Sequence, residues 1–293
     1  MRIFVAGATG VLGRALLPIL QQEGHTVRTL VRSEEKAQTL QHTGIEAGVG
    51  DLLAQEIEPR LLSMLEGCDT AIHIATAIPR NMSAPGAWDI NTRLRVEGTQ
   101  RLLQASLTVG VKRYIQQSIT MAYPDGGDEW IYENTPLDAS PQRADICGPV
   151  IDMEDLVRDV AREQLHWCIL RGGLFVGPGT GQEDVLAKIR AGTSVVPCDG
   201  SNFLSLIHVA DMADAISKAL VHAPAGTIYN IVDEPIRSGD YLSHLAHLVG
   251  APQPEQDYSQ PCPLSQRCSN QAAGTILGWV PTHGIWPTYN KFS

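Results

Sequence analysis

Residues 1–31 read MRIFVAGATGVLGRALLPILQQEGHTVRTLV and combine two apolar runs, a glycine-rich turn and an amphipathic segment. Residues 2–6 are a short β-branched and aromatic run that stops at a glycine, which is typical of a buried strand. From residue 11 to 23, apolar side chains recur at helical spacing, and a second strand-like run covers 26–31. The stretch therefore predicts a βαβ unit whose first turn is rich in glycine.

The turn places glycine at its first, fourth and seventh positions, Gly7, Gly10 and Gly13. Small residues let backbone N–H groups approach a pyrophosphate at the positive end of a helix. Three spaced glycines are a weak signal alone, but their position between a strand and a helix indicates a dinucleotide site. A tight turn without a ligand is the alternative. The predicted contacts come from Gly7, Thr9, Gly10, Val11, Leu12 and Gly13.

The residue after the second strand indicates which dinucleotide binds. A carboxylate there would accept hydrogen bonds from the adenosine ribose, whereas this chain has Arg32 directly after Val31. A guanidinium binds phosphate oxygens in a bidentate fashion, so Arg32 favours the 2′-phosphate of NADP. Arg14, in the first helical turn, could add a second positive charge. We therefore expect NADP rather than NAD, although NAD stays possible if both arginines are only solvated.

Composition excludes several classes of partner. The 293 residues carry 22 Lys and Arg against 32 Asp and Glu, a net charge of −10, with no basic run. Nucleic acid and anionic membranes are therefore not expected as partners. The six cysteines are scattered, with no C-x-x-C pair and no metal spacing, so we expect reduced thiols and no metal site. With no signal peptide and no membrane-length apolar run, we expect a cytoplasmic protein.

Strand and helix patterns alternate along the rest of the chain. Strands are expected at 45–49, 70–75, 111–117, 167–170 and 227–232, and helices at 33–41, 56–65, 88–109 and 207–220. This alternation predicts an α/β protein with a Rossmann-like, doubly wound parallel sheet. Ligands of such sheets bind beyond the carboxyl ends of the strands. The residues there are Gly7 to Gly13, Arg32, Asp51, Leu52, Ala75 to Ile78 and Ser118 to Thr120.

Residues 121–148 are irregular and too long for a simple connector, which predicts a binding loop or lid. A helix is expected to open at Gly148-Pro149, with the proline in its first turn. Its acidic residues (Asp152, Glu154 and Asp155) are expected to be solvated. We place a dinucleotide-binding domain at 1–173 plus about 203–234. A small C-terminal substrate lobe takes about 174–202 plus 235–293.

A family resemblance rests on motifs that occur in order along nearly the whole chain. They include Gly7 to Gly13, Gly50-Asp51-Leu52, His73-Ile74-Ala75, Glu97-Gly98-Thr99, Gln117 to Thr120, His208 to Asp211 and Leu277 to Pro281. Together they resemble an extended or atypical short-chain dehydrogenase/reductase of the NAD-dependent epimerase/dehydratase family. The resemblance implies a Rossmann domain with a small C-terminal lobe. It places Asp51 and Leu52 by the adenine, Ala75 and Thr76 by the phosphates and ribose, and Leu174 by the nicotinamide.

The chain departs from this family at the catalytic residues. The family uses a Ser or Thr after the fifth strand, and a Tyr and a Lys four residues apart on the next helix. Ser118 matches the first element, but Ile146 and Val150 occupy the tyrosine and lysine places. Neither side chain can transfer a proton. The usual dyad is therefore absent.

Three interpretations remain open at this level. The first is an NADP-dependent oxidoreductase or epimerase-like enzyme for a small carbonyl or hydroxyl substrate, with Ser118 or Thr120 orienting the substrate. Tyr123 would then be the substitute acid, although a loop anchor with a half-buried ring is the favoured interpretation of this residue. The second is a non-catalytic NADP-binding sensor or partner-binding protein. The third is a fold whose cofactor site is vestigial. A monomer or a homodimer is expected.

Overall fold

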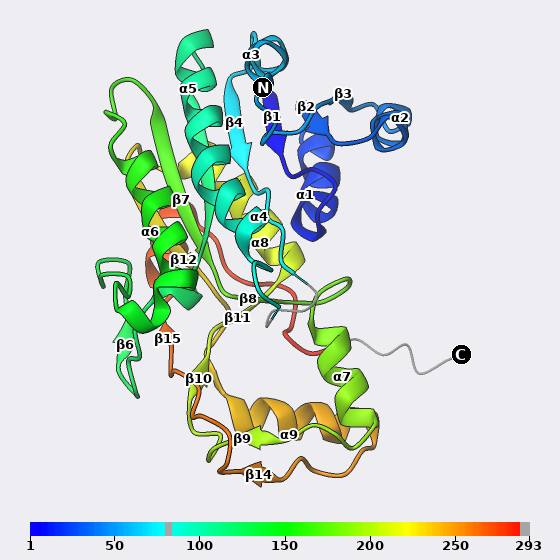
Figure 1. The fold of residues 1–293 in the computed structure, drawn as a ribbon, viewed down its shortest axis with the longest axis vertical. Helices are drawn as coiled ribbons and strands as arrows, with labels where there is room; N and C mark the ends of the chain where they lie inside the picture. Colours follow the sequence, from blue (N-terminus) through cyan, green and yellow to red (C-terminus); the bar gives the residue numbers. More distant parts are fainter. Residues whose placement is uncertain (80–83, 288–293) are drawn as a thin grey trace. The chain divides into compact units, whose positions relative to one another are not determined.

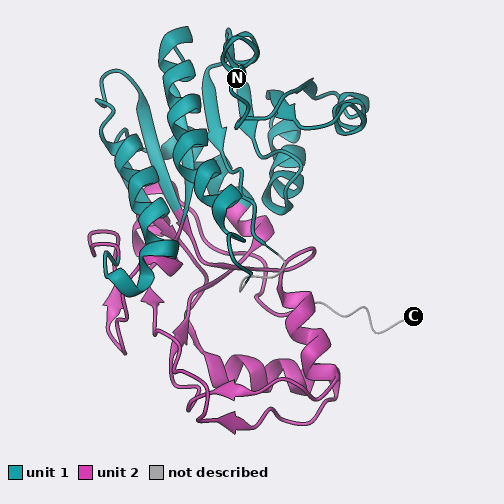
Figure 2. Ribbon diagram, in the orientation of Figure 1, with its two compact units in different colours: residues 1–118, 138–170, 213–228 teal, residues 119–137, 171–212, 229–293 magenta. Residues whose placement is uncertain are grey.

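The computed structural model describes residues 1–79 and 84–287, and their contacts group into two units (Figure 2). Unit 1 comprises residues 1–118, 138–170 and 213–228. Unit 2 comprises residues 119–137, 171–212 and 229–293. The second unit is larger than the lobe expected from the sequence, because residues 119–137, 171–173, 203–212 and 229–234 also group with it.

Most residues of a seven-stranded sheet, in the order β12-β7-β5-β4-β1-β2-β3, belong to unit 1 (Figure 1). Its strands are β1 (Arg2–Ala6), β2 (Thr26–Val31), β3 (Glu46–Val49), β4 (Thr70–His73), β5 (Arg113–Ile119), β7 (His166–Gly172) and β12 (Thr227–Ile231). Across the sheet, β5, β4, β1, β2 and β3 each pair in parallel with their neighbours in this series. Ile3 of β1 lies opposite Val27 of β2 on one side and Thr70 of β4 on the other. Strands that pair in parallel must be joined by crossover connections, which are usually helices. The predicted doubly wound sheet is confirmed.

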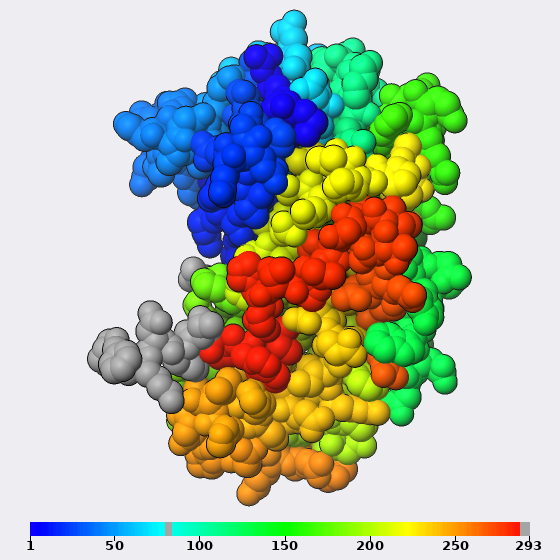
Figure 3. All heavy atoms as spheres, turned by 180° about the vertical axis from the view of Figure 1, so that it is seen from behind, coloured from blue at the N-terminus to red at the C-terminus, as the bar shows by residue number. Residues whose placement is uncertain are grey.

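Helices cover both faces of this sheet. They are α1 (Val11–Gln22), α2 (Glu34–His42), α3 (Glu58–Leu65), α4 (Asp89–Arg93), α5 (Thr99–Val109), α6 (Ala144–Arg158) and α8 (Val209–His222). Figure 1 shows α5 and α6 on the near face, and Figure 3, seen from behind, shows α8 in yellow beside α1 in blue. The Ser217 hydroxyl of α8 donates to Glu23, directly after α1, across 2.6 Å. Buried side chains of α3, α5 and α6 pack with β4, β5 and β7 in one apolar cluster.

The structure corrects two helical predictions. The helix expected at 88–109 is α4, a π-helical turn η1 (Leu94–Gly98) and α5 in succession. The helix expected to open at Gly148 begins four residues earlier, at Ala144, so Pro149 lies inside α6. A 3-10 turn, η3 (Pro141–Arg143), leads directly into this helix. Pro149 removes one backbone donor from α6 and crowds the carbonyl of residue 145. The buried side chains of the next two turns stabilise the helix against this cost.

Unit 2 is built from short strand pairs and two helices. The pairs are β8 (Leu174–Val176) with β11 (Leu206–His208), β10 (Phe203–Leu204) with β13 (Ile236–Arg237), β9 (Val196–Pro197) with β14 (Gln256–Asp257), and β6 (Trp130–Ile131) with β15 (Arg267–Cys268). The helices are α7 (Gln182–Arg190) and α9 (Ser238–Val249), and η4 (Ala273–Leu277) is a π-helical turn. Leu186, Leu206 and Leu245 belong to the apolar cluster that joins α7, β11 and α9.

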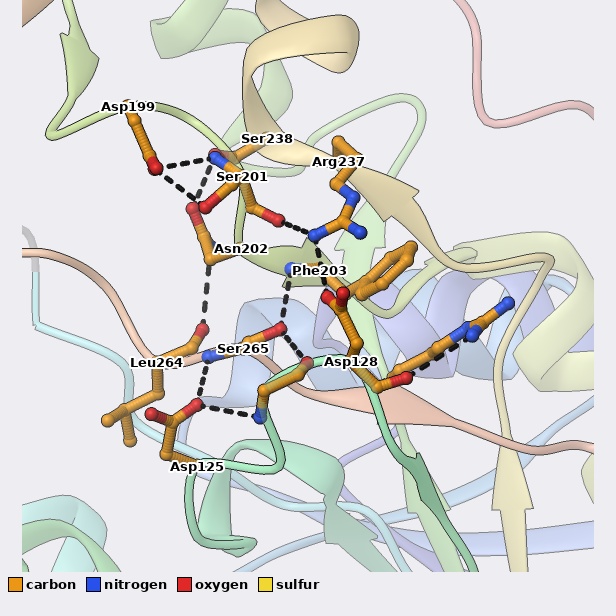
Figure 4. A network of polar contacts seen from close by, with 12 residues as sticks. Asp125, Asp128, Asp199, Ser201, Asn202, Phe203, Arg237, Ser238, Leu264 and Ser265 are labelled. Atoms are coloured by element: carbon orange, nitrogen blue, oxygen red, sulfur yellow. Dashed lines mark hydrogen bonds and ion pairs between the residues drawn. The ribbon is translucent and has the colours of Figure 1, made fainter.

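A disulfide joins Cys198 to Cys262 in unit 2, which corrects the expectation of six reduced thiols. Their separation of 64 residues gave no spacing signal, but the pairing of β14 with β9 brings the two segments together. Polar contacts bind the same loops to their neighbours (Figure 4). Ser265 donates its N–H to Asp125 across 2.8 Å and accepts from the N–H of Phe203 across 3.0 Å.

The described residues contain neither a membrane-spanning helix nor a metal-binding cluster. No helix within residues 1–79 and 84–287 is long and apolar enough to cross a membrane. Over the same ranges, no group of three or more His, Cys, Asp or Glu side chains is placed to hold a metal ion.

Candidate functional site

Two glycines of the first turn are required by the fold itself. Gly7 has φ +103°, and a Cβ there would lie 2.6 Å from the backbone N of Ala75. A Cβ on Gly13 would lie 2.3 Å from the carbonyl oxygen of Ala8. Real Cβ atoms do not approach backbone this closely, so neither position accepts a side chain without displacing main chain. These glycines close the turn between β1 and α1.

Gly10 differs from its two neighbours in the motif. Its φ of −71° is open to any residue, and an added Cβ would meet only the Gly7 carbonyl oxygen, at 3.3 Å. Gly10 is exposed and is the N-cap of α1, so no side chain caps the first N–H groups of this helix. The fold alone therefore does not require glycine here. The open space at the positive end of α1 fits the pyrophosphate of a dinucleotide, which would accept hydrogen bonds from Val11 and Leu12.

Two exposed arginines are candidates to hold a phosphate of the cofactor, Arg14 in the first turn of α1 and Arg32 directly after β2. Arg14 of α1 donates from Nη1 to the carbonyl oxygen of Thr9 across 2.9 Å, which places its charge beside the turn. Arg32 follows β2 directly, as predicted, before Ser33 caps α2 by accepting from the N–H of Lys36. Because β1 and β2 are parallel neighbours, Gly7 and Arg32 leave the sheet at the same edge. An anionic phosphate suits this edge.

The other residues of unit 1 that were predicted to contact the cofactor follow β3 and β4. Asp51 accepts from the N–H of Leu53 across 2.9 Å, and Arg101 donates to the carbonyl oxygens of Leu52 and Ala54 across 2.8 and 2.7 Å. The turn beside the expected adenine position is therefore held by α5.

After β4, Ala75 borders Gly7 and Thr76 is exposed. The Asn91 side chain accepts from the N–H of Ala77 across 3.0 Å and so anchors this segment. Leu174, the predicted nicotinamide neighbour, lies in unit 2 and is half exposed.

Ile146 and Val150, the positions predicted to correspond to the family's tyrosine and lysine, both lie on α6. Ile146 is exposed on α6, and Val150, one turn later, is fully buried. Ser118 is also buried, and its hydroxyl donates to Oε1 of Glu154 across 2.5 Å. Glu154 is only 1 % exposed, so the expectation that it is solvated was wrong. Positions 150, 153, 154 and 157 form one inward stripe of α6, and this periodicity could have shown that Glu154 faces inward.

The core of unit 1 also contains a buried arginine, Arg95. Arg95 extends from the π-turn η1 and is 5 % exposed, with Nη1 4.0 Å from Sδ of Met153. Burial lowers the pKa of Arg95 to about 10, while the charge of Glu154 opposes that shift. Its guanidinium therefore stays protonated at neutral pH. Sequence reasoning missed Arg95, because nothing in a single helical pattern marks a cation that points into the core.

His73, at the end of β4, is buried and neutral. Burial, followed by the charge of Arg95, lowers the pKa of His73 to about 4. Its Nδ1 lies 3.5 Å from Nε2 of Gln116. Nε2 has no hydrogen-bond partner among the described residues. His73 is therefore a neutral residue of the core of unit 1.

Tyr123 and Thr120 belong to unit 2, and both are buried. The Tyr123 hydroxyl donates to Oδ1 of Asn230 across 2.8 Å and accepts from Nη1 of Arg171 across 2.7 Å. Burial raises the pKa of Tyr123 well above its ordinary value. Thr120 Oγ1 lies 3.4 Å from the carbonyl oxygen of Gly172. These contacts favour the loop-anchor interpretation of Tyr123.

Comparison with known families identifies the fold. A family model described as NAD dependent epimerase/dehydratase family matches residues 3–232. The chain belongs to this family. Its Rossmann sheet and glycine turn are therefore those of an NAD(P)-binding protein of the epimerase/dehydratase type.

Two curated relatives carry the names of reductases. The chain is 31 % identical over 305 residues to a 3-diazoavenalumate denitrifying reductase from a Streptomyces species, covering 98 % of each chain. It is 29 % identical over 256 residues to a 4-hydroxy-2-methyl-3-oxo-4-farnesyl-3,4-dihydroquinoline-1-oxide ketoreductase from Stigmatella aurantiaca, covering 85 % of this chain and 74 % of the relative. The family and these relatives support an enzyme of the oxidoreductase or epimerase type.

Solved structures share the fold at lower identity. A dTDP-glucose 4,6-dehydratase from Streptomyces venezuelae, solved with NAD, matches with a TM-score of 0.79 and 21 % identity over 97 % of this chain and 93 % of that one. A UDP-glucose 4-epimerase from Thermotoga maritima, solved with UDP-glucose, gives a TM-score of 0.79 and 20 % identity over 97 % and 95 %.

Proposed function

We propose that this chain is an NADP-dependent reductase. The observation that carries the proposal is the open space at Gly10, where the fold permits a side chain and the helix N-terminus is left uncapped. Val11 and Leu12 would hold the pyrophosphate through their backbone N–H groups, with Gly10 leaving room beside them. Arg32, with Arg14, would hold the 2′-phosphate that distinguishes NADP from NAD. Asp51, Leu52, Ala75, Thr76 and Leu174 are proposed as further cofactor contacts.

We propose that the substrate, which accepts the hydride, needs no proton from the enzyme. NADPH, when bound, would supply a hydride. Its addition at an arene-diazonium carbon would form a C–H bond, break the C–N bond and release N₂ without consuming a proton. A carbonyl acceptor would instead form an alkoxide that must be protonated. Ile146 and Val150 cannot donate that proton, and the Ser118 hydroxyl is already donated to Glu154. The name of the Streptomyces relative, a denitrifying reductase of a diazo compound, supports this acceptor class.

Reduction of a small carbonyl, or oxidation of the corresponding hydroxyl, is the second candidate. It is favoured by the ketoreductase name of the Stigmatella relative. In that case Ser118 or Thr120 would orient the substrate oxygen, and Tyr123 would be the substitute acid. A non-catalytic NADP-binding sensor remains the alternative in which no hydride moves.

Calorimetric titration with NADPH and NADH tests the cofactor assignment. Wild type is compared with Arg32→Ala, and with Arg158→Ala as a control for loss of an exposed charge on α6. We expect NADPH to bind more tightly, and Arg32→Ala alone to erase that advantage. If neither nucleotide binds, the vestigial interpretation replaces this proposal.

The acceptor class is tested by following NADPH absorbance with benzenediazonium and with benzaldehyde, each against an enzyme-free reaction. Enzyme-dependent oxidation with benzenediazonium alone supports the proposal. Oxidation with benzaldehyde alone favours the carbonyl reductase. NADPH binding without turnover across wider panels of both acceptor classes favours the sensor.

A further inference from the structure

The disulfide of unit 2 lines a small surface cavity. Cys198 and Cys262 both border this cavity, whose volume is about 250 Å³. Sites for drug-sized ligands measure about 300–1,000 Å³, so this cavity suits a smaller molecule. Cys262 is exposed and Cys198 is half-buried, whereas the other four cysteines of the chain are buried. Exchange between a thiol and a disulfide requires access to a sulfur atom, and exposed bridges are the labile ones.

The two cysteines are held differently by their backbones. Cys198 follows β9 directly, and its N–H donates to the carbonyl oxygen of Asp257 in β14 across 2.9 Å. It has φ +56°, a left-handed conformation that the surrounding structure must enforce on a residue other than glycine. Cys262 lies in segment 258–266, which contains no helix or strand. Because Cys262 is the more exposed of the two, an approaching thiolate meets its sulfur, and Cys198 is the sulfur that leaves.

Carboxylates outnumber cations around the cavity (Figure 4). Asp125, Asp128 and Asp199 line it together with Arg237. Arg237 is paired with Asp128, with 2.8 Å between Nη1 and Oδ1. Hydrogen bonds from Ser201 lower the pKa of Asp199, so this carboxylate is anionic at neutral pH. The lining therefore carries a negative charge that Arg237 does not balance.

We propose that the bridge is a site of thiol exchange, at which Cys262 takes up a small thiol as a mixed disulfide, and that the cavity favours a cationic thiol over an anionic one. The thiolate forms an S–S bond with Cys262 while the bond between Cys262 and Cys198 breaks. The electron pair of that bond leaves with Cys198, whose thiolate takes up the proton that the small thiol released. One disulfide replaces another, so no oxidant is needed. This modification goes beyond the proposed reductase activity and does not depend on it.

Cysteamine and 2-mercaptoethanesulfonate are a matched pair of probes, both two-carbon thiols but opposite in charge. The folded full-length chain is mixed with each thiol at neutral pH and low ionic strength, and samples are quenched with acid. Intact-mass spectrometry follows the uptake of the thiol, and peptide mapping locates it. Each rate is divided by the rate of the same thiol on bis(2-hydroxyethyl) disulfide, so that differences in thiol acidity and nucleophilicity cancel.

Two carboxylate variants test the role of charge. Asp199→Asn removes one carboxylate of the cavity. Asp184→Asn removes an exposed carboxylate of α7 that does not line the cavity, and is the control. Circular dichroism of each variant checks that it is folded.

We expect the normalised rate of wild type and of Asp184→Asn to be about threefold or more higher with cysteamine, because charges within one Debye length attract or repel the thiol. Asp199→Asn should narrow this ratio, and high salt should bring it toward one. The added thiol should map to Cys262. The rate should rise in proportion to thiol concentration, because the bridge is accessible in the folded chain.

Two kinds of result would overturn the proposal. A rate independent of thiol concentration would mean that the bridge reacts only after unit 2 unfolds, and an adduct on Cys198 would reverse the assigned roles. A normalised ratio of one or below in wild type, or an unchanged ratio in Asp199→Asn, would exclude selection by charge. The salt dependence of the wild-type ratio decides the matter if Asp199→Asn does not fold. No nucleotide is present, so failure of the proposed reductase function leaves these rates unchanged.

Discussion

Gly10→Ala tests the proposed cofactor site separately from the fold, because the fold does not require glycine at this position. The added methyl meets only one protein atom within 4 Å, the Gly7 carbonyl oxygen at 3.3 Å, and the φ of −71° is favourable for alanine. Alanine is a weaker N-cap than glycine, but it also reduces the entropy of the unfolded chain. We expect the free energy of unfolding to change by no more than about 1 kcal/mol.

The same methyl would occupy the space proposed for the pyrophosphate. Displacing the phosphates from the N–H groups of α1 would weaken charge-assisted hydrogen bonds worth about 1.5–3 kcal/mol each. We therefore expect Gly10→Ala to weaken NADPH binding by about tenfold to a hundredfold or more. Calorimetric titration measures the affinity, and urea unfolding measures the stability.

Two other glycines are controls for Gly10→Ala. Gly148→Ala adds a methyl with nothing within 4 Å, inside α6, and should keep full affinity. Gly13→Ala would bring Cβ to 2.3 Å from backbone and should impair folding itself. Gly10→Ala with wild-type affinity and wild-type stability would refute the placement of the pyrophosphate at this turn.

Three further predictions concern unit 2 and the core of unit 1. Cys262→Ser, or reduction of the wild type by a dithiol, should lower the free energy of unfolding by about 4 kcal/mol, the chain-entropy value for a separation of 64 residues; an unchanged urea midpoint on reduction would show that the bridge does not stabilise the fold. Tyr123→Phe removes the hydroxyl that donates to Asn230 and accepts from Arg171, and should lower the free energy of unfolding by about 1–3 kcal/mol. Its turnover per folded enzyme should stay near wild type, because a general acid would instead cost about a hundredfold or more. For His73, the pKa falls from 6.5 to about 4 on folding, so the unfolded chain binds more protons between these values. The free energy of unfolding should therefore fall by about 3 kcal/mol as the pH is lowered from 6.5 to 4. His73→Gln should flatten this part of the stability–pH profile measured by urea unfolding.

Local sequence pattern was sufficient to predict the βαβ unit. Strands β1 and β2 have the predicted bounds, because a short apolar run between breakers and a helical repeat are both set by near neighbours. The absence of a dissociable side chain at Ile146 and Val150 is likewise a matter of residue identity. No contact is needed to establish either point.

Tertiary structure decided what those patterns could not. The glycines of the turn look alike in the sequence, and only the approach of Ala75 and Ala8 separates Gly7 and Gly13 from Gly10. The bond between Ser118 and Glu154 spans 36 residues. The pairing of Cys198 with Cys262 spans 64. Such pairs depend on which elements the fold packs together, and the spacing of residues along one helix or strand carries no information about a partner on another.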